Sequence, residues 1–266
     1  MTTGTDLPDV VCGEADGVAT IVIDRPSRRN ALAIATWHAL RAAVVAADAD
    51  PRTRVILVRG AAGTFGAGND LDEFAGLCGD PEGALAFGFA MATAMQAIET
   101  ASKPVIMAIQ GSCYGASVAL ALAGDLRFAA DDASFAITPA KLGALYLRSD
   151  LHRLVAAVGA GHAKRLIYSA QAIDAARAER IGLIDEVLAA DRFEEELGVF
   201  LQHVLRGSTY TVRRSKEMLS TVGAGLAPPE DEESLASFVA ATQGEDFREG
   251  VDAFLGKRAP RFARAG

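Results

Sequence analysis

The sequence predicts an α/β protein with a parallel sheet, followed by a region built only from helices. Three observations lead to this prediction. Apolar, strand-like runs alternate with helical patterns as far as about residue 190. Two of these runs, 54–59 and 105–109, are continuously apolar between their flanking residues, which is typical of strands covered on both faces. From residue 192 onward every periodic segment is helical in character and none is a strand candidate.

The individual elements follow in order along the chain. Residues 17–24 are rich in β-branched side chains and are expected to pair with residues 10–13 as a hairpin. Residues 34–49 carry apolar side chains at helical spacing, and this pattern ends at Asp50 and Pro51. A further helix is expected between the two buried strands. That helix spans 83–101, and the remaining helices are expected at 192–205, 209–221, 232–242 and 245–255.

Length and composition limit the class of protein. The 266 residues suffice for one large domain or two small ones, and we divide them into a core, 1–191, and a helical oligomerisation region, 192–266. The net charge of −8 repels polyanions, so nucleic acid is a poor candidate partner. The most apolar window, 84–98, is shorter than the roughly 18 to 20 residues of a membrane span.

The compartment is predicted from the cysteines and the amino terminus. Cys12, Cys78 and Cys113 are odd in number and widely spaced, which favours free thiols in a reducing compartment. The first nine residues contain neither the basic stretch nor the apolar core of an export signal. A cytoplasmic protein is therefore expected.

Two segments combine a buried strand, a turn of small residues and the start of a helix. They span residues 55–74 and 105–123, with the small residues at 60–70 and 110–117. Small side chains let a ligand approach the backbone, and the first turn of a helix presents unbonded N–H groups. Two such turns facing each other could form an oxyanion hole, although tight backbone packing explains the same composition. Neither segment has the spacing of a dinucleotide or P-loop motif.

Six motifs in order carry a family resemblance that covers nearly the whole chain. The chain resembles the crotonase superfamily of enoyl-CoA hydratases and isomerases. The motifs are Arg25-Pro26 with Asn30-Ala31-Leu32, Phe65 to Asp70, Lys103-Pro104-Val105 leading to Gly111 and Gly115, Asp125, Phe135 with Leu142-Gly143, and Glu249-Gly250 with Ala253 to Arg258 and Phe262.

This resemblance implies a spiral of ββα turns with a helical trimerisation region, assembled as a homotrimer or a dimer of trimers. It implies an acyl-CoA substrate, with coenzyme A as part of the substrate and no separate cofactor. Matching the family's motifs to this sequence places the two oxyanion donors at the backbone amides of Asn69 and Ala116. The implied coenzyme A contacts are Arg28, Arg29 and Ala31, together with Phe254 and Lys257 acting on a neighbouring subunit. Solvated turn charges are an equally good interpretation of the two arginines.

The chain departs from the family where hydratases place two glutamates that activate water. Ala119 and Pro139 occupy those positions, and neither side chain can transfer a proton. Residues 135–146 instead resemble the corresponding stretch of methylmalonyl-CoA decarboxylase, in which a Thr and a Tyr at the places of Thr138 and Tyr146 line the reacting end. That decarboxylase has a His at the place of Asn69 and a Glu at the place of Ala119. A core-edge tyrosine and a turn-forming threonine are the structural alternatives.

The sequence is therefore compatible with three functions. The first is a lyase of decarboxylase type that stabilises a thioester enolate. The second is a hydratase or isomerase that uses other groups, such as Asp70, Tyr146 or a water chain, and the third is a non-catalytic acyl-CoA-binding protein. Ser112, Cys113 and Ser117 lack a base placed by the sequence to activate them as nucleophiles. The four histidines show no metal-ligand spacing, so no metal site is expected.

Overall fold

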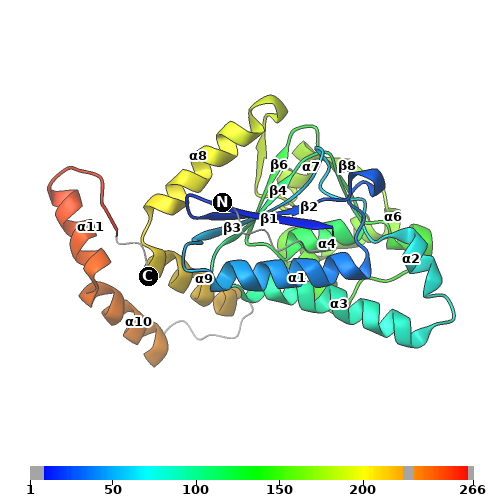
Figure 1. The fold of residues 1–266 in the computed structure, drawn as a ribbon, viewed down its shortest axis with the longest axis horizontal. Coiled ribbons are helices and arrows are strands. Elements are labelled where there is room, and N and C mark those ends of the chain that lie inside the picture. Colours follow the sequence, from blue (N-terminus) through cyan, green and yellow to red (C-terminus); the bar gives the residue numbers. More distant parts are fainter. Residues whose placement is uncertain (1–8, 224–230, 263–266) are drawn as a thin grey trace.

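A six-stranded sheet forms the centre of the fold (Figure 1). The computed structural model describes residues 9–223 and 231–262. The sheet has the order β1-β2-β3-β4-β6-β9, and every pair after β1–β2 is parallel. The strands are β1 Val10–Ala15, β2 Val18–Ile23, β3 Val55–Gly60, β4 Val105–Ile109, β6 Leu126–Ala130 and β9 Glu186–Leu188. The predicted parallel α/β core is confirmed.

The predicted hairpin is also present, with a shorter turn than expected. β1 and β2 pair antiparallel from Val10–Ile23 to Ala15–Val18, which leaves only Asp16 and Gly17 as the loop. Both loop residues have positive φ, 51° and 89°, as two-residue turns matching strand twist require. The strand β1 therefore extends through Glu14 and Ala15, which the sequence pattern assigned to the loop.

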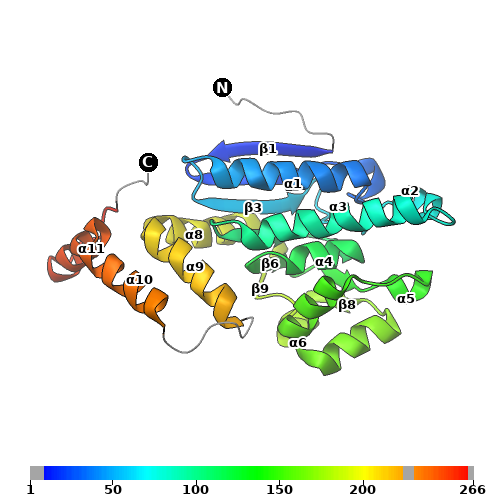
Figure 2. The ribbon, with the colours of Figure 1, turned by 90° about the horizontal axis from the view of Figure 1, so that it is seen from below.

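Helices cover both faces of the sheet (Figure 2). Alternate residues of the central strands point to opposite sides, so Ile56 and Val58 join one cluster while Val55 and Leu57 join the other. Helices α1, Ile34–Ala49, and α3, Pro81–Thr100, supply the first cluster together with α4, Ala116–Leu122. Helix α8, Phe193–Arg206, supplies Phe193, Leu197 and Leu201 to the second. This two-sided burial is the reason that β3 and β4 read as continuous apolar runs.

A small second sheet and several short helices complete the core. Strands β5 Ser112–Tyr114, β7 Ser134–Ala136 and β8 Ile173–Asp174 form that sheet. The remaining core elements are η1 Pro26–Arg28, α2 Leu71–Gly76, α5 Pro139–Leu142, α6 Arg148–Ser169, α7 Ala175–Arg180 and η2 Ala190–Arg192. The sequence pattern does not single out these strands, because runs of two or three residues show no measurable periodicity.

Three further helices follow α8: the first lies against the core, where its Lys216 pairs with Asp125, and the other two lie away from the sheet (Figure 1). They are α9 Thr209–Gly223, α10 Glu232–Gln243 and α11 Glu245–Leu255, close to the predicted bounds. Asp231 caps α10 by accepting from the Ser234 amide at 2.7 Å, as acidic residues at a helix start do. Within the described ranges, no helix has both the length and the apolarity that a membrane crossing requires.

Asn30 joins the segment after β2 to the turn after β3. Its side chain is fully buried, and Oδ1 accepts from the Arg25 amide at 2.9 Å. Its Nδ2 donates to the carbonyl oxygens of Ala61, at 2.9 Å, and Thr64, at 2.6 Å. Its φ of 53° lies in the left-handed region, which asparagine tolerates better than most residues. This one side chain therefore sets where two loops stand relative to each other.

We expect Asn30→Ala to lower the free energy of unfolding by about 3 kcal/mol, because it leaves buried backbone groups without partners. The urea denaturation midpoint measures this loss. Asp16→Ala is the matched control, since Asp16 also has a positive φ but is exposed. The control should cost about 1 kcal/mol, the strain of a left-handed alanine. Equal losses in the two variants would contradict the role given to the Asn30 hydrogen bonds.

Candidate active site

The two turns of small residues lie against each other at the carboxyl ends of β3 and β4. These strands are parallel neighbours, so the segments that follow them emerge at the same edge of the sheet. A bridge then joins the turns directly. The Gly66 amide donates to the Ser112 carbonyl at 2.9 Å, and the Tyr114 amide donates to the Gly66 carbonyl at 2.9 Å. The facing turns that the sequence predicted are thus in hydrogen-bonded contact.

Two glycines make the closest part of this contact possible. Gly68 has a φ of 99°, and a Cβ atom on it would lie 3.0 Å from the Tyr114 carbonyl oxygen and 3.4 Å from the Ala116 nitrogen. Gly115 has φ 53° and ψ −122°, and a Cβ atom there would lie 2.9 Å from Thr138 Oγ1. Side chains at either position would be both strained and crowded. The backbone around Asn69 is therefore held beside the start of α4.

The amide of Asn69 points away from its neighbouring strand segment. Leu32 bridges Asn69 in parallel: the Leu32 amide donates to the Gly68 carbonyl at 2.7 Å, and the Asp70 amide donates to the Leu32 carbonyl at 3.0 Å. In such a bridge the central residue turns its own N–H to the opposite side. No acceptor for the Asn69 N–H exists among residues 9–223 and 231–262.

The amide of Ala116 is also unused by the fold. Ala116 is the first residue of α4, and first-turn N–H groups have no acceptor within their own helix. In the part of the chain that the structure describes, nothing else accepts from it. Two N–H groups from adjacent turns therefore stand without protein partners. Groups so placed can bind one oxygen atom and stabilise negative charge that develops on it.

The side chain of Asn69 is tied to α1 and α3. The Trp37 indole Nε1 donates to Asn69 Oδ1 at 3.2 Å, and Asn69 Nδ2 lies 3.5 Å from Met91 Sδ. Trp37 is fully buried, so this contact anchors the first turn to the core. No sequence pattern indicates this contact, because the partners of Asn69 are 32 and 22 residues away and lie on different elements.

Tyr146 and Thr138 both lie against the second turn. The Tyr146 hydroxyl donates to the Gly115 carbonyl oxygen at 2.5 Å. Burial raises the pKa of Tyr146 well above its usual value, so the phenol stays protonated. Thr138 precedes α5, and its hydroxyl makes no capping hydrogen bond to that helix. The structure therefore brings together all four residues assigned to the reaction: Asn69, Ala116, Thr138 and Tyr146.

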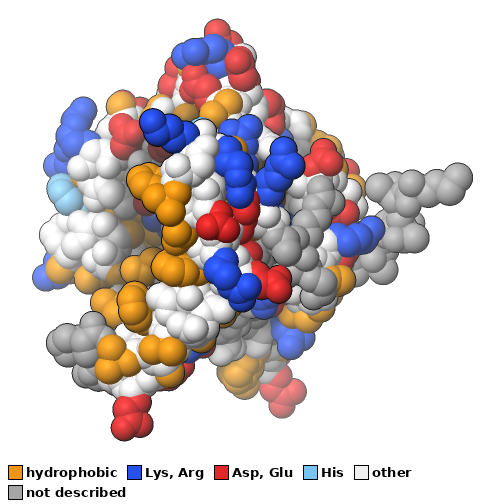
Figure 3. All heavy atoms as spheres, turned by 90° about the vertical axis from the view of Figure 1, so that its left-hand side faces the viewer, with side chains coloured by type: hydrophobic (Ala, Val, Ile, Leu, Met, Phe, Trp, Pro, Cys, Tyr) orange, Lys and Arg blue, Asp and Glu red, His pale blue; other side chains and the backbone are white. Residues whose placement is uncertain are grey.

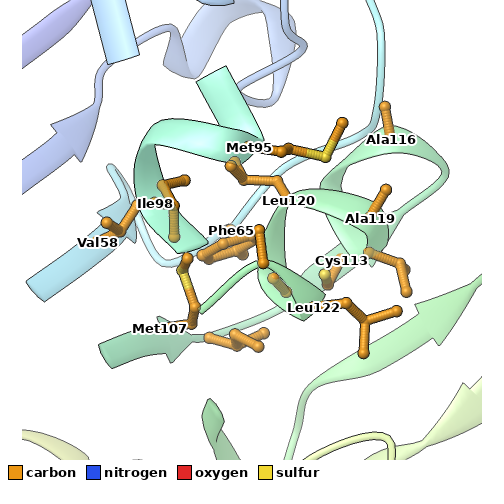
Figure 4. Close-up of a cluster of buried hydrophobic side chains, with 14 of the residues drawn as sticks. Val58, Phe65, Met95, Ile98, Met107, Cys113, Ala116, Ala119, Leu120 and Leu122 are labelled. Atoms are coloured by element: carbon orange, nitrogen blue, oxygen red, sulfur yellow. The ribbon is translucent and has the colours of Figure 1, made fainter. Parts of the chain in front are cut away.

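Ala119 and Pro139, the residues expected at the two hydratase glutamate positions, both have a structural explanation. Ala119 is fully buried on α4, among the apolar side chains drawn in Figure 4. Pro139 is the first residue of α5, a position that suits proline because no N–H is needed there. The apolar core and a helix start thus account for both residues.

Asp70, the acid considered as a substitute, has a structural role. Its carboxylate caps α2 through the Asp72 amide at 3.1 Å and pairs with Arg25 at 3.0 Å. Burial acts to raise the pKa of Asp70, but hydrogen bonds from Arg25 and the Asp72 amide outweigh it and lower the pKa. An ionised carboxylate paired in this way is poorly suited to donate a proton.

The residues assigned to coenzyme A fall into two separate groups. Arg28, Arg29 and Ala31 lie on the segment beside the first turn, where the Ala67 amide donates to the Arg29 carbonyl at 3.0 Å. Arg28 is exposed and pairs with Asp72 at 2.6 Å, whereas Ala31 is buried. Phe254 and Lys257 lie at the end of α11, on the opposite side of the chain from α2 (Figures 1 and 2). One protomer does not bring the two groups together.

The small polar residues near the second turn pack into the structure. Ser117 is fully buried, and its Oγ accepts from the Gly68 amide at 3.1 Å. Cys113 is fully buried, and burial raises the pKa of its thiol well above the usual value. Neither side chain is placed as an activated nucleophile. No group of three metal-ligating side chains occurs among the residues that the structure describes.

Sequence reasoning missed a polar cluster behind Tyr146. The buried Asp150 carboxylate accepts from the Leu147 amide at 3.1 Å and from Arg153 Nη1 at 2.9 Å. Arg153 also binds the Glu99 carboxylate through two hydrogen bonds, at 2.6 Å and 2.8 Å. An acidic residue three positions after Leu147 is a recognisable helix-start signal. The pairing with Glu99 has no local signal, since 54 residues separate the partners.

Comparison with known proteins identifies what this chain is similar to. The profile of the enoyl-CoA hydratase/isomerase family matches residues 13–265. The 2,3-dehydroadipyl-CoA hydratase of Escherichia coli is 30% identical over 96% of this chain and 99% of its own. The methylmalonyl-CoA decarboxylase of E. coli is 30% identical over 80% and 82%. A crystal structure of an enoyl-CoA hydratase/isomerase family protein from Hyphomonas neptunium superposes with a TM-score of 0.91, at 37% identity over 96% and 98%.

The three cysteines should differ in reactivity according to burial. At about pH 8, we expect an aromatic disulfide reagent to modify Cys78 first, because it is exposed. Cys12 should react more slowly, since burial raises its pKa and lowers the thiolate fraction at that pH. Cys113 should react only after unfolding. Peptide mass spectrometry over time measures each site. Modification of folded protein at Cys113 as fast as at Cys78 would restore Cys113 as a candidate nucleophile.

Proposed function

This chain belongs to the enoyl-CoA hydratase/isomerase family and has the crotonase fold, and from that premise we propose that it acts on an acyl-CoA thioester through an oxyanion hole. The hole is formed by the amides of Asn69 and Ala116. The observation that carries this proposal is the pair of N–H groups on touching turns, neither of which has an acceptor in the described chain. The thioester carbonyl oxygen would take the place of the missing acceptor.

The reaction that fits the site best is decarboxylation of a malonyl-type thioester. The bond between the α-carbon and the carboxylate carbon breaks, carbon dioxide leaves, and the electron pair moves onto the thioester oxygen. The two amides stabilise the resulting enolate. The electron pair then returns as the α-carbon takes a proton from water. This sequence needs no general base at the places of Ala119 and Pro139, and the relative named as a decarboxylase supports it.

Hydration or isomerisation of an enoyl thioester is the second candidate. The names of relatives favour it, since 2,3-dehydroadipyl-CoA hydratase and crotonyl-CoA hydratase are similar over nearly all of this chain. The chemistry of the site opposes it. Adding water across a double bond usually relies on a positioned acid or base worth about 10² to 10⁴ in rate. The carboxylate at the end of the first turn, Asp70, is ion-paired with Arg25.

We further infer a homotrimer or a dimer of trimers in which α9 to α11 meet a neighbouring subunit. Phe254 is 83% exposed, and other large apolar side chains of α10 and α11 are also exposed on the face shown in Figure 3. A groove of about 710 Å³ between α9, α10 and α11 is lined mainly by apolar groups. Such a patch is typical of protein–protein contact. Assembly would carry Phe254 and Lys257 towards the coenzyme A bound by another chain.

A panel of malonyl-, methylmalonyl- and enoyl-CoA substrates tests the reaction. We expect carbon dioxide release from a malonyl-type thioester and no hydration of the enoyl substrates, because the two hydratase glutamates are absent. Coupled detection of carbon dioxide and chromatography of the CoA products measure both. Hydration without decarboxylation would establish the second candidate. Binding of acyl-CoA without any turnover would favour the non-catalytic function instead.

Ala116→Pro is the decisive variant for the same assay. Proline removes the N–H at the first position of α4, where it suits a helix and breaks no hydrogen bond of the described fold. We expect kcat to fall by about 10² to 10³, the usual effect of losing one oxyanion donor. Affinity for free coenzyme A and the unfolding midpoint should change little. Retention of full turnover by this variant would refute the oxyanion hole.

Lys257→Ala tests the coenzyme A contact across subunits. We expect affinity for coenzyme A to weaken by about 1 kcal/mol, as for a charged hydrogen bond at a partly exposed site. Isothermal titration calorimetry measures the affinity. Lys164→Ala is the matched control, because Lys164 is an exposed lysine on α6. Equal affinity of the two variants for coenzyme A would contradict the predicted contact of Lys257.

A further inference from the structure

We infer that Tyr146 is a positioning residue that holds the Gly115–Ala116 peptide by its carbonyl and so directs the Ala116 N–H. This inference rests on the proposed oxyanion hole and assigns Tyr146 a role other than contact with substrate. The observation behind it is the hydrogen bond of 2.5 Å from the Tyr146 hydroxyl to the Gly115 carbonyl oxygen. That carbonyl and the proposed oxyanion donor belong to one peptide group.

The geometry of a peptide group explains how the hydroxyl can act at a distance. The group is planar and rigid, and its C=O and N–H point in opposite directions. A donor that fixes the oxygen therefore fixes the direction of the N–H as well. Hydrogen bonding to the carbonyl also polarises the amide, which strengthens its N–H as a donor. Tyr146 thus orients and activates the Ala116 amide by binding the carbonyl oxygen on the opposite side of the same peptide group.

The first turn holds its own donor in the same manner. The Asn69 N–H belongs to the Gly68–Asn69 peptide, whose carbonyl accepts from the Leu32 amide at 2.7 Å. Both proposed oxyanion peptides are therefore secured by their carbonyl oxygens. The first is held by backbone alone and the second also by a side chain, so only the second can be altered by a conservative substitution.

The bond from Tyr146 is the shorter of two that hold the carbonyl of the second peptide. Gly115 adopts φ 53° and ψ −122°, a conformation favoured only for glycine. Its carbonyl also accepts from the Val118 amide, but at the longer distance of 3.0 Å. The Tyr146 hydroxyl is thus a second donor to this carbonyl and adds to the hold of α4 on the peptide plane.

The loop that carries Tyr146 is itself anchored. Asp150 accepts from the Leu147 amide, one residue after Tyr146, and also binds Arg153. Arg153 then binds Glu99 of α3 through two hydrogen bonds. This chain of contacts connects the oxyanion peptide to a long core helix. Asp150 and Arg153 accordingly support the position of the phenol.

This hydrogen bond also limits what Tyr146 can do to substrate. A tyrosine hydroxyl has one proton to donate, and here it is directed to the Gly115 oxygen. While that bond persists, the hydroxyl cannot protonate the enolate carbon or donate to a substrate carboxylate. A positioning role and a direct role therefore predict different effects of removing the hydroxyl.

Infrared spectroscopy of bound acetyl-CoA, labelled with ¹³C at the thioester carbonyl, separates these roles without turnover. In the unaltered protein the oxyanion hole should move the carbonyl stretch to lower wavenumber on binding. In Tyr146→Phe we expect a smaller shift, affinity for free coenzyme A unchanged, and kcat on the active thioester about tenfold lower, as for one lost hydrogen bond of about 1.4 kcal/mol. Tyr168→Phe, a change at an exposed tyrosine on α6, should change none of these.

The outcomes distinguish this inference from the proposed function. If acetyl-CoA binds to the unaltered protein with no carbonyl shift, the oxyanion hole itself is wrong. If the unaltered protein shows the shift and Tyr146→Phe retains all of it, only the positioning role is wrong. Should Tyr146→Phe fail to fold, Asp150→Asn serves instead, because it keeps an acceptor for the Leu147 amide but weakens the pairing with Arg153. A full carbonyl shift in that variant would equally overturn the inference.

Discussion

The close approach of two backbone turns is the constraint on which the rest of this structure depends. A Cβ atom on Gly66 would lie 2.4 Å from Ser117 Oγ, and one on Gly68 would lie 3.0 Å from the Tyr114 carbonyl oxygen. Because only glycine avoids these overlaps, the small residues are required by geometry. Their contact holds the backbone before Asn69 against the start of α4, and the adjacent parallel strands β3 and β4 bring both turns to one edge of the sheet.

The rest of the core secures these turns by buried polar contacts. Asn30 connects the turn after β3 to the end of β2, and Trp37 binds the Asn69 side chain. Ser117 accepts from the Gly68 amide inside the contact itself. Each contact satisfies a buried polar group that would otherwise destabilise the fold. The same hydrogen bonds therefore stabilise the protein and preorganise the proposed oxyanion hole.

The proposed site offers donors that can stabilise negative charge, but it lacks the two carboxylates that hydratases use to transfer protons. Enoyl-CoA hydratases need both, whereas this chain has Ala119 and Pro139 where their glutamates stand and holds Asp70 in an ion pair. A reaction whose main requirement is a stabilised enolate suits such a site. Tyr146 then contributes through the Gly115–Ala116 peptide to which it donates. This role is compatible with a phenol that is buried and stays protonated. Exposed apolar side chains on α10 and α11 complete the proposal by supplying a surface for assembly.

The sequence by itself determined the α/β class, the hairpin, the long helices other than α6 and the order of the glycine-rich turns, because periodicity and turn chemistry are local properties. Short strands such as β7 and β9 were not predicted, because a run of three residues shows no periodicity. Only the tertiary structure decided what the polar side chains contact. Tyr146 hydrogen-bonds to Gly115, Arg153 to Glu99 and Asn30 to Thr64, although 31, 54 and 34 residues, respectively, separate these partners in the sequence. Such pairings are set by packing of distant elements, and residue spacing along the chain contains no record of them.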